Sequence, residues 1–207
     1  MFVIASEAKQ SRTTLHCTRL PRSLRSLAMT VIPQKFYSRP TLKVAQELVG
    51  CFLVRAGRGK IWRAMITETE AYVGEDDLAS HASRGRTPRT ELMYGEPGHA
   101  YVYMIYGMYY CLNIVTEKKD FPAAALIRGV EIESIDRKKT NGPGKLCKFL
   151  KIDKKFNGWD MTKSEKLWIE KPAQNFSKKN IVAGRRIGID YAKHCKEYLW
   201  RFQLKTE

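Results

Sequence analysis

Residues that could support hydrolytic chemistry gather between positions 68 and 89 of the chain. Glu68, Glu70 and Tyr72 alternate along one short segment, so their side chains share a face if that segment is a β-strand. A histidine and three arginines follow, at His81, Arg84, Arg86 and Arg89. A carboxylate can activate water, an aromatic ring can stack on a nucleobase, and guanidinium groups bind phosphates. The combination favours hydrolysis of the bond that joins a base to a nucleic acid.

Each of these residues also has a simpler structural interpretation. Glu68 and Glu70 are typical of a strand face in contact with solvent, and His81 is typical of a loop residue that makes one hydrogen bond. Asn113 fits a strand end or a turn, and Arg128 fits one half of a structural ion pair. Taken one at a time, these residues do not decide between a structural and a catalytic role.

The apolar segment from His99 to Val115, HAYVYMIYGMYYCLNIV, is predicted to form a β-hairpin that turns at Tyr106-Gly107. On its first strand, Tyr101 and Tyr103 share one face. Tyr106 stands at the tip, where a large ring has no core to pack against, and this favours contact with a partner molecule. The alternative is a core hairpin with ordinary cross-strand aromatic pairs.

Composition narrows the class of partner. The 207 residues include 37 Lys and Arg against 21 Asp and Glu, a formal net charge of +16, which makes nucleic acid or an anionic membrane the first partners to consider. No apolar run approaches the length of a membrane span, so we expect a soluble cytoplasmic protein. The five cysteines are widely spaced and lack a Cys-x-x-Cys motif, which indicates reduced thiols and neither a disulfide framework nor a zinc site.

Residues 1–30 differ from the rest of the chain, because they are rich in Arg and Ser and contain Glu7 as their only acid. We expect a basic, disordered N-terminal extension here, with Met29 as the natural start, followed by one domain over residues 31–207. A transit peptide is the alternative, since such segments are rich in Arg and poor in acid. Without the extension's five basic and one acidic residues, 32 basic and 20 acidic residues remain, so a charge of +12 belongs to the folded part.

The elements that must position these residues are predicted from periodicity and turn signals. We expect a helix at 41–49, strands at 51–55, 61–72 and 123–130, a basic helix at 145–150, a short helix after 162–165, and final strands at 185–189 and 199–204 with a helix between them. The glycine-rich turn before the basic helix, residues 141–144, could hold a phosphate, although it lacks the P-loop motif. Residues 162–165 have the pattern of a capping box. Residues 73–98 show no periodicity, and so long a connection is typically functional or mobile.

Together these segments resemble a known family. The blocks EAYVG, SH, RTPR, YVYMIYGM and CLN, followed by Arg128, closely resemble the alkyladenine (3-methyladenine) DNA glycosylases. The similarity continues through NGPGKLCKFLKI to RIGI, and it covers nearly everything from Phe36 onward. The blocks are specific in combination, far more than any short motif. The resemblance implies a single mixed α+β domain built on a curved antiparallel β-sheet, with a protruding β-hairpin and flanking helices.

The resemblance also implies roles for individual residues. Glu70 would be the general base that activates water, and Arg128 would help to position that water and the nucleotide. The residues around the flipped base would be Tyr72, His81, Tyr103 and Asn113, and Tyr106 would intercalate where that base had been. The contacts to the DNA backbone would come from Arg84, Arg86, Arg89, Met108 and Lys145.

The expected substrate is double-stranded DNA that contains a damaged purine of the 3-methyladenine or hypoxanthine class. The family is monofunctional, leaves an abasic site and needs no cofactor or metal, and we expect a cytoplasmic, nucleoid-associated monomer. One carboxylate could suffice for a cationic alkylated purine, which leaves as a neutral base, whereas a neutral lesion such as hypoxanthine needs a proton from elsewhere. A non-catalytic nucleic-acid-binding module is the alternative, and an enzyme that acts on RNA is a third interpretation.

Two departures from the family pattern bear on substrate preference. Tyr109-Tyr110 follows Met108 where we expect a His or Tyr-Phe in the family, and Gly129-Val130-Glu131-Ile132 replaces the usual Ala-Leu-Glu-Pro after Arg128.

Overall fold

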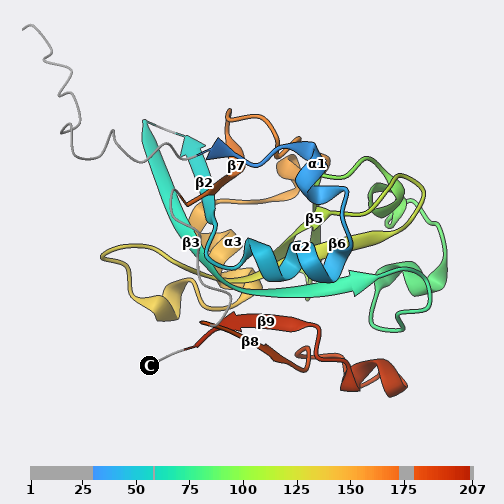
Figure 1. Ribbon diagram of the computed structural model, residues 1–207. Coiled ribbons are helices and arrows are strands. Elements are labelled where there is room, and N and C mark those ends of the chain that lie inside the picture. The colour runs from blue at the N-terminus through green and yellow to red at the C-terminus, as the bar shows by residue number, and fades with distance from the viewer. Residues whose placement is uncertain (1–29, 58, 173–179, 206–207) are drawn as a thin grey trace, which may run out of the picture.

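The computed structural model of the protein describes residues 30–57, 59–172 and 180–205 (Figure 1). Its strands are β1 (Thr30–Val31), β2 (Phe52–Gly57), β3 (Lys60–Val73), β4 (Ala100–Ile105), β5 (Tyr109–Val115), β6 (Ala123–Glu131), β7 (Leu167–Lys171), β8 (Ile181–Gly184) and β9 (Arg201–Leu204). Its α-helices are α1 (Gln34–Tyr37), α2 (Thr41–Leu48) and α3 (Pro143–Leu150). The 3₁₀ turns are η2 (His81–Arg84), η3 (Glu91–Tyr94), η4 (Arg137–Lys139), η5 (Lys154–Phe156) and η7 (Lys193–Glu197).

The described strands form one sheet in the order β1-β7-β2-β3-β6-β5-β4, and β9 pairs with both β3 and β8. Every pairing among these strands is antiparallel. The long strand β3 connects the parts of the sheet, because it pairs with β2 near its start, with β6 over most of its length and with β9 around residues 68–70. The predicted α+β domain on a curved antiparallel sheet is therefore confirmed.

Helices cover the sheet where its strands expose apolar side chains. Helix α2 buries Val44, Ala45 and Leu48, which lie on one helical face and pack toward β3 and β6. Figure 1 shows α2 on one side of β3 and the β8–β9 pair on the other. Helix α3 packs against β5 and β6. Within the described residues, no helix is long and apolar enough to span a membrane.

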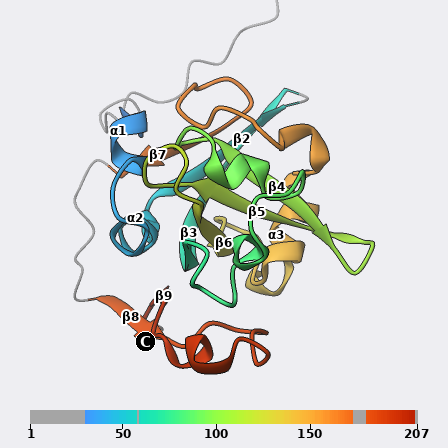
Figure 2. The same cartoon turned by 90° about the vertical axis from the view of Figure 1, so that its right-hand side faces the viewer.

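The predicted hairpin is confirmed as β4 and β5, and Figure 2 shows it extending away from the body of the protein. Its register pairs Tyr103 with Cys111 and Ile105 with Tyr109. Tyr106 and Gly107 both have positive φ angles, 51° and 67°, which is the turn geometry that matches the twist of two antiparallel strands. Tyr106 at the tip is 86% exposed, so it does not belong to the core.

Three predictions for the C-terminal part are wrong. No helix forms between Thr162 and β7, because the Thr162 backbone N–H and hydroxyl both donate to Asp160 Oδ1, at 2.9 and 2.6 Å, and the chain then enters β7. Residues 185–189 are not a strand either. The strand ends at Gly184, and Gly188, with a φ angle of 76°, interrupts the extended backbone. The residues between β8 and β9 contain only a 3₁₀ turn, η7, where a helix was expected. The predicted N-terminal extension, apart from Thr30, lies outside the described residues.

Candidate active site

Strand β3 brings Glu70 and Tyr72 to one face of the sheet, as the alternation in the sequence predicts. The Tyr72 hydroxyl donates to Glu70 Oε2 at 2.8 Å. The other oxygen, Oε1, accepts the backbone N–H of Ile187 at 2.8 Å and lies 3.4 Å from Arg128 Nε. Glu70 is completely buried, so it is not part of a solvated strand face.

Burial and hydrogen bonding act on the Glu70 carboxyl in opposite directions. Burial raises its pKa above the ordinary value, while Arg128, the Ile187 N–H and the Tyr72 hydroxyl each favour the ionised form. The pKa of Tyr72 is raised well above its ordinary value, first by burial and then by the neighbouring Glu70 charge. Tyr72 therefore remains a protonated phenol and a hydrogen-bond donor. The site combines a base of raised pKa with fixed donors around it.

The Glu70 carboxylate keeps acceptor capacity for a water molecule. A carboxylate offers about four lone-pair sites. The Tyr72 hydroxyl and the Ile187 N–H occupy two of them, and Arg128 Nε forms an ion pair with the carboxylate at 3.4 Å. All three of these residues line a cavity, so the carboxylate lies behind the cavity wall that they form. A water bound at one of the remaining sites would be well placed for general-base catalysis.

The cavity next to Glu70 has a volume of about 570 Å³, within the range of about 300–1,000 Å³ that is usual for small-molecule sites. It is lined by all the residues that the family resemblance assigned to the base pocket and to intercalation: Tyr72, His81, Tyr103, Tyr106 and Asn113. Arg128 lines it as well. These residues come from β3, η2, β4, the hairpin turn, β5 and β6, so only the folded sheet brings them together.

Aromatic rings form one side of the cavity. The ring centroids of His81 and Tyr103 are 4.5 Å apart, and those of Tyr101 and Tyr103 are 5.3 Å apart. The His81 Nδ1 atom is 3.0 Å from the Tyr101 hydroxyl. Burial and the nearby charges of Arg89 and Arg84 lower the pKa of His81 to about 4, so its imidazole is neutral at pH 7. A neutral ring can bind the edge of a base but is a poor proton donor.

Asn113 is buried on β5 opposite Tyr101, and its Nδ2 atom donates to the Tyr101 backbone carbonyl at 3.1 Å. This bond fixes the orientation of the side chain within the cavity wall. Tyr101 was assigned no role from the sequence, although its place on the same strand face as Tyr103 was the available signal. It contributes to the site by holding both His81 and Asn113.

The residues expected to contact the DNA backbone lie around the cavity in different environments. Arg89 places its guanidinium 5.5 Å from the centre of the Tyr103 ring, and it lines the cavity. Met108 is 66% exposed beside Tyr106 at the hairpin tip, and Lys145 is exposed in the first turn of α3. Arg84 is exposed at the end of η2.

Arg86 differs from these residues because acidic partners already hold it. Its guanidinium binds both carboxylate oxygens of Glu91, at 2.7 and 2.9 Å, and lies 3.1 Å from Asp120 Oδ1. A phosphate would have to compete with these carboxylates. Its contact with DNA stays a prediction, as do those of the other four residues.

The segment between β8 and β9 forms a wall of the cavity that the sequence did not predict. Ile187, Gly188, Ile189 and Tyr191 all line it, and Ile187 supplies the backbone N–H that binds Glu70. The RIGI block in the sequence was the available signal, but the strand predicted there gave it no role.

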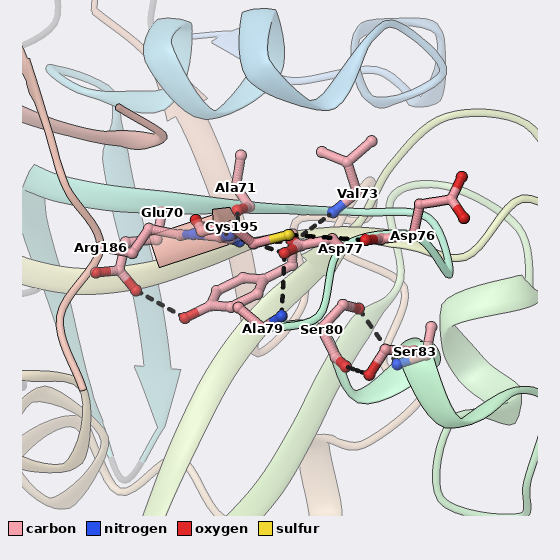
Figure 3. Close-up of polar contacts among 12 residues, drawn as sticks. Glu70, Ala71, Val73, Asp76, Asp77, Ala79, Ser80, Ser83, Arg186 and Cys195 are labelled. Atoms are coloured by element: carbon pink, nitrogen blue, oxygen red, sulfur yellow. Dashed lines mark hydrogen bonds and ion pairs between the residues drawn. The ribbon is translucent and has the colours of Figure 1, made fainter. Parts of the chain in front are cut away.

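A buried ion pair fixes this segment to the connection that follows β3. Arg186 Nη1 and Nη2 bind the Asp77 carboxylate at 2.6 and 2.8 Å, and neither side chain is exposed. Asp77 also accepts the backbone N–H groups of Val73 and Ala79, and Figure 3 shows it between these residues and Arg186. Because Ile187 follows Arg186 directly, the pair fixes the donor that reaches Glu70.

The described residues contain no group of three or more His, Cys, Asp and Glu side chains that could hold a metal ion. The adjacent His194 and Cys195, interpreted from the sequence as structural, lie 3.5 Å apart between Nε2 and Sγ, and Cys195 is completely buried.

The departure at Gly129 has a steric consequence: a Cβ atom there would lie 3.0 Å from Thr67 Oγ1. Glycine therefore permits the close approach of β3 and β6 beside Arg128.

A buried carboxylate behind an aromatic cavity, with an exposed ring on a protruding hairpin, is an arrangement suited to a DNA glycosylase, an enzyme that cleaves damaged bases from DNA. Comparison with known proteins gives the family. The family model described as methylpurine-DNA glycosylase matches residues 35–207, and the chain belongs to this family. The resemblance found in the sequence is confirmed. The expected activity, that of a monofunctional glycosylase that acts on alkylated bases, is confirmed as well.

Several relatives are provisionally named 3-methyladenine DNA glycosylases. One from Methanocella arvoryzae is 50% identical over 195 residues, which cover 86% of this chain and 94% of that protein. One from Clostridium perfringens strain SM101 is 44% identical and covers 82% of this chain and 93% of that protein. One from Wolbachia pipientis is 48% identical and covers 84% of this chain and 90% of that protein.

Proposed function

We propose that the protein flips a damaged purine of the 3-methyladenine or hypoxanthine class out of double-stranded DNA and hydrolyses its N-glycosidic bond. The observation that carries this proposal is that Tyr72 and Arg128, at the wall of one aromatic cavity, both contact the Glu70 carboxylate behind it. A flipped base needs such a cavity, because it loses its stacking partners in the duplex and regains them on protein rings.

Hydrolysis follows from the remaining acceptor capacity of Glu70. The carboxylate takes a proton from water, and the water oxygen forms a bond to C1′ of the deoxyribose. The bond between C1′ and the purine nitrogen breaks, and its electron pair passes to the base. For a cationic alkylated purine this pair neutralises the positive charge, so the base leaves without a proton from the enzyme. The products are the free base and an abasic site in an intact strand.

The protonation states around the cavity favour cationic lesions over neutral ones. His81 has a pKa of about 4 and is neutral at pH 7, and burial raises the pKa of Tyr72 and Tyr103 above the ordinary value. None of these three residues is a good acid near neutral pH. Hypoxanthine, which needs a proton to leave easily, should therefore be excised more slowly than an alkylated adenine.

Tyr106 is proposed to fill the gap that the flipped base leaves in the duplex. It is exposed at the tip of the hairpin, and it also borders the cavity that would receive the base. An inserted side chain offsets part of the cost of unstacking, which is about a few kcal/mol per step. The backbone contacts proposed for Arg84, Arg86, Arg89, Met108 and Lys145 would hold the duplex around this wedge.

We further propose that the glycosylase domain spans residues 31–207 and acts as a monomer on DNA in the cytoplasm. The support for a monomer is that one chain supplies every residue assigned to the cavity, so the site does not depend on a second copy. The family match from residue 35 supports the boundary.

The direct test is incubation with duplexes that carry one alkylated adenine or one hypoxanthine, followed by alkaline cleavage to count abasic sites. A lesion-free duplex and the same lesion in RNA are the controls. We expect abasic sites only at the lesion in DNA, with the alkylated adenine released faster. Lesion binding without abasic sites would favour the non-catalytic binding module, and equal release from RNA would change the substrate class.

A further inference from the structure

Glu68 lies where the pairing between β3 and β6 changes register. The register pairs Ile66 with Val130, Glu68 with Gly129 and Thr69 with Ile127. Two residues, Thr67 on β3 and Arg128 on β6, therefore have no opposite partner in this ladder. Such bulges turn side chains out of the regular alternation and are common next to active sites. Here the bulge directs Arg128 toward both acidic residues of β3.

The result is a network in which acidic and basic side chains alternate. Arg128 Nε lies 3.3 Å from Glu68 Oε1 and 3.4 Å from Glu70 Oε1. The same Glu68 oxygen lies 3.1 Å from Arg201 Nη1 of β9. Arg201 is itself fixed by its bonds to Gln203 Oε1 and to the Arg185 carbonyl, both at 2.7 Å. Two carboxylates and two guanidinium groups thus balance one another.

This network is shielded from solvent, unlike an ordinary surface ion pair. The side chains of Glu68 and Arg128 are each 14% exposed, and that of Arg201 is 21% exposed. Charges in such positions interact more strongly than exposed ones, because less water screens them. Gly129 permits the close pairing of the two strands here, since a Cβ atom there would lie 3.0 Å from Thr67 Oγ1.

We propose that Glu68 is a positioning residue for base excision, which holds the Arg128 guanidinium beside Glu70 and shares its charge. The proposal rests on the proposed function of Glu70 as the general base. Glu68 acts only through Arg128 and does not line the cavity. Without it, the single Arg128 charge would be directed at Glu70 alone, and the carboxylate that must accept a proton would become a weaker base.

The electrostatic effect has a definite sign. The negative charge of Glu68 raises the pKa of Glu70, and the Arg128 charge lowers it. Removing the Glu68 charge leaves the cluster with excess positive charge, which favours ionised Glu70. Removing the Arg201 charge does the opposite. The other ionisable groups that act on Glu70 or are influenced by it are Tyr72, Tyr103, Cys111 and Arg186.

The experiment measures single-turnover excision of a cationic alkylated adenine as a function of pH, with lesion binding measured separately. For Glu68→Gln we expect a plateau rate about 10-fold lower, because a weaker base accepts the proton less readily. We also expect the acidic limb of its pH–rate profile to move to lower pH. For Arg201→Gln the limb should move to higher pH. Glu131→Gln, which removes an exposed carboxylate from β6, is the matched control for net charge and should behave as the wild type.

The two opposite displacements separate positioning from simple structural damage. A loss of rate at every pH, with an unmoved limb in both variants, would overturn the proposal, as would wild-type behaviour of Glu68→Gln. If a thermal melt shows that Glu68→Gln does not fold, the pH–rate profile of Arg201→Gln decides the question. An acidic limb at higher pH supports the proposal, and an unchanged limb overturns it. A wild-type protein that forms no abasic sites would refute the proposed function itself, and the positioning role with it.

Discussion

Replacement of Glu70 by glutamine tests the centre of the mechanism because it removes one charge and preserves the shape of the side chain. The amide oxygen can still accept the Ile187 N–H, and the amide nitrogen can donate to the Tyr72 hydroxyl in place of the present bond. Arg128 keeps Glu68 as a partner at 3.3 Å. No buried group is therefore left without a hydrogen bond.

The stability of Glu70→Gln should stay close to that of the wild type. Hydrogen bonds to a charged group contribute about 1.5–3 kcal/mol each, against about 0.5–1.5 kcal/mol for neutral ones. The variant loses this difference but also avoids the cost of burying an ionised carboxylate, which is several kcal/mol. Since the two effects have opposite sign, we expect the free energy of unfolding to change by about 1 kcal/mol or less.

Excision should respond very differently from stability. A general base contributes roughly 10²- to 10⁴-fold to a rate, which corresponds to about 2.7–5.4 kcal/mol of activation free energy. The assay is single-turnover release of one alkylated adenine from a duplex with the enzyme in excess. Lesion affinity is measured in parallel. Glu131→Gln again serves as the control for lost charge.

Two results would refute this reasoning. Excision near the wild-type rate would mean that Glu70 is not the base, whatever its position. A loss of lesion binding as large as the loss of rate would mean that Glu70 shapes the cavity and does not activate water.

Four further predictions concern the wedge, the charge, the histidine and the N-terminal extension. Tyr106→Ala should leave the melting temperature unchanged, because the ring is 86% exposed, but it should reduce base flipping as reported by a fluorescent base analogue beside the lesion. Non-specific DNA affinity should fall steeply between low and physiological salt, because the +12 charge outside residues 1–30 would displace counterions from phosphates; fluorescence anisotropy measures this. The pKa of His81 lies near 4 in the folded protein against 6.5 ordinarily, so the unfolded chain binds the extra proton between these values. Stability should therefore decrease as pH falls from 6.5 to about 4, and less so in His81→Gln, as followed by thermal melts. A chain that starts at Met29 should keep the melting temperature and excision rate of the full chain.

Each of these predictions has a contrary outcome. Unfolding of Tyr106→Ala with normal flipping would make the ring part of the core, and affinity that ignores salt would argue against phosphate contacts. Identical pH profiles for the wild type and His81→Gln would contradict a neutral buried histidine. A large loss of either property on removal of residues 1–28 would show that the extension belongs to the working protein.

Much of the fold and part of the site could be predicted from local patterns. The alternation of Glu70 and Tyr72 correctly placed both side chains on one face, because residues two apart in a strand always share a face. Tyr106-Gly107 marked the hairpin turn, since glycine readily adopts the positive φ angle that the turn requires. The linked blocks around these residues were sufficient to identify the family.

The contacts that complete the site were decided by tertiary structure alone. Ile187 donates to Glu70 across 117 residues of sequence, and Arg186 reaches Asp77 across 109. Neither approach follows from periodicity, which describes neighbours within one strand and not the packing of a distant segment. The sequence led to the wrong element at 185–189 for the same reason, because a β-rich composition does not show that a backbone N–H binds a carboxylate.

The partnership of Glu68 with Arg128 belongs to the same class of contact. Strand rise alone placed Glu68 about 6–7 Å from Glu70 and left it without a role. The register change at Thr67 and Arg128 directs one guanidinium to both carboxylates, and the pairing of β9 with β3 adds Arg201. The sequence by itself determined which chemical groups are present and the local elements that hold them. The register between strands, which depends on the packing of the whole sheet, determined which charges meet.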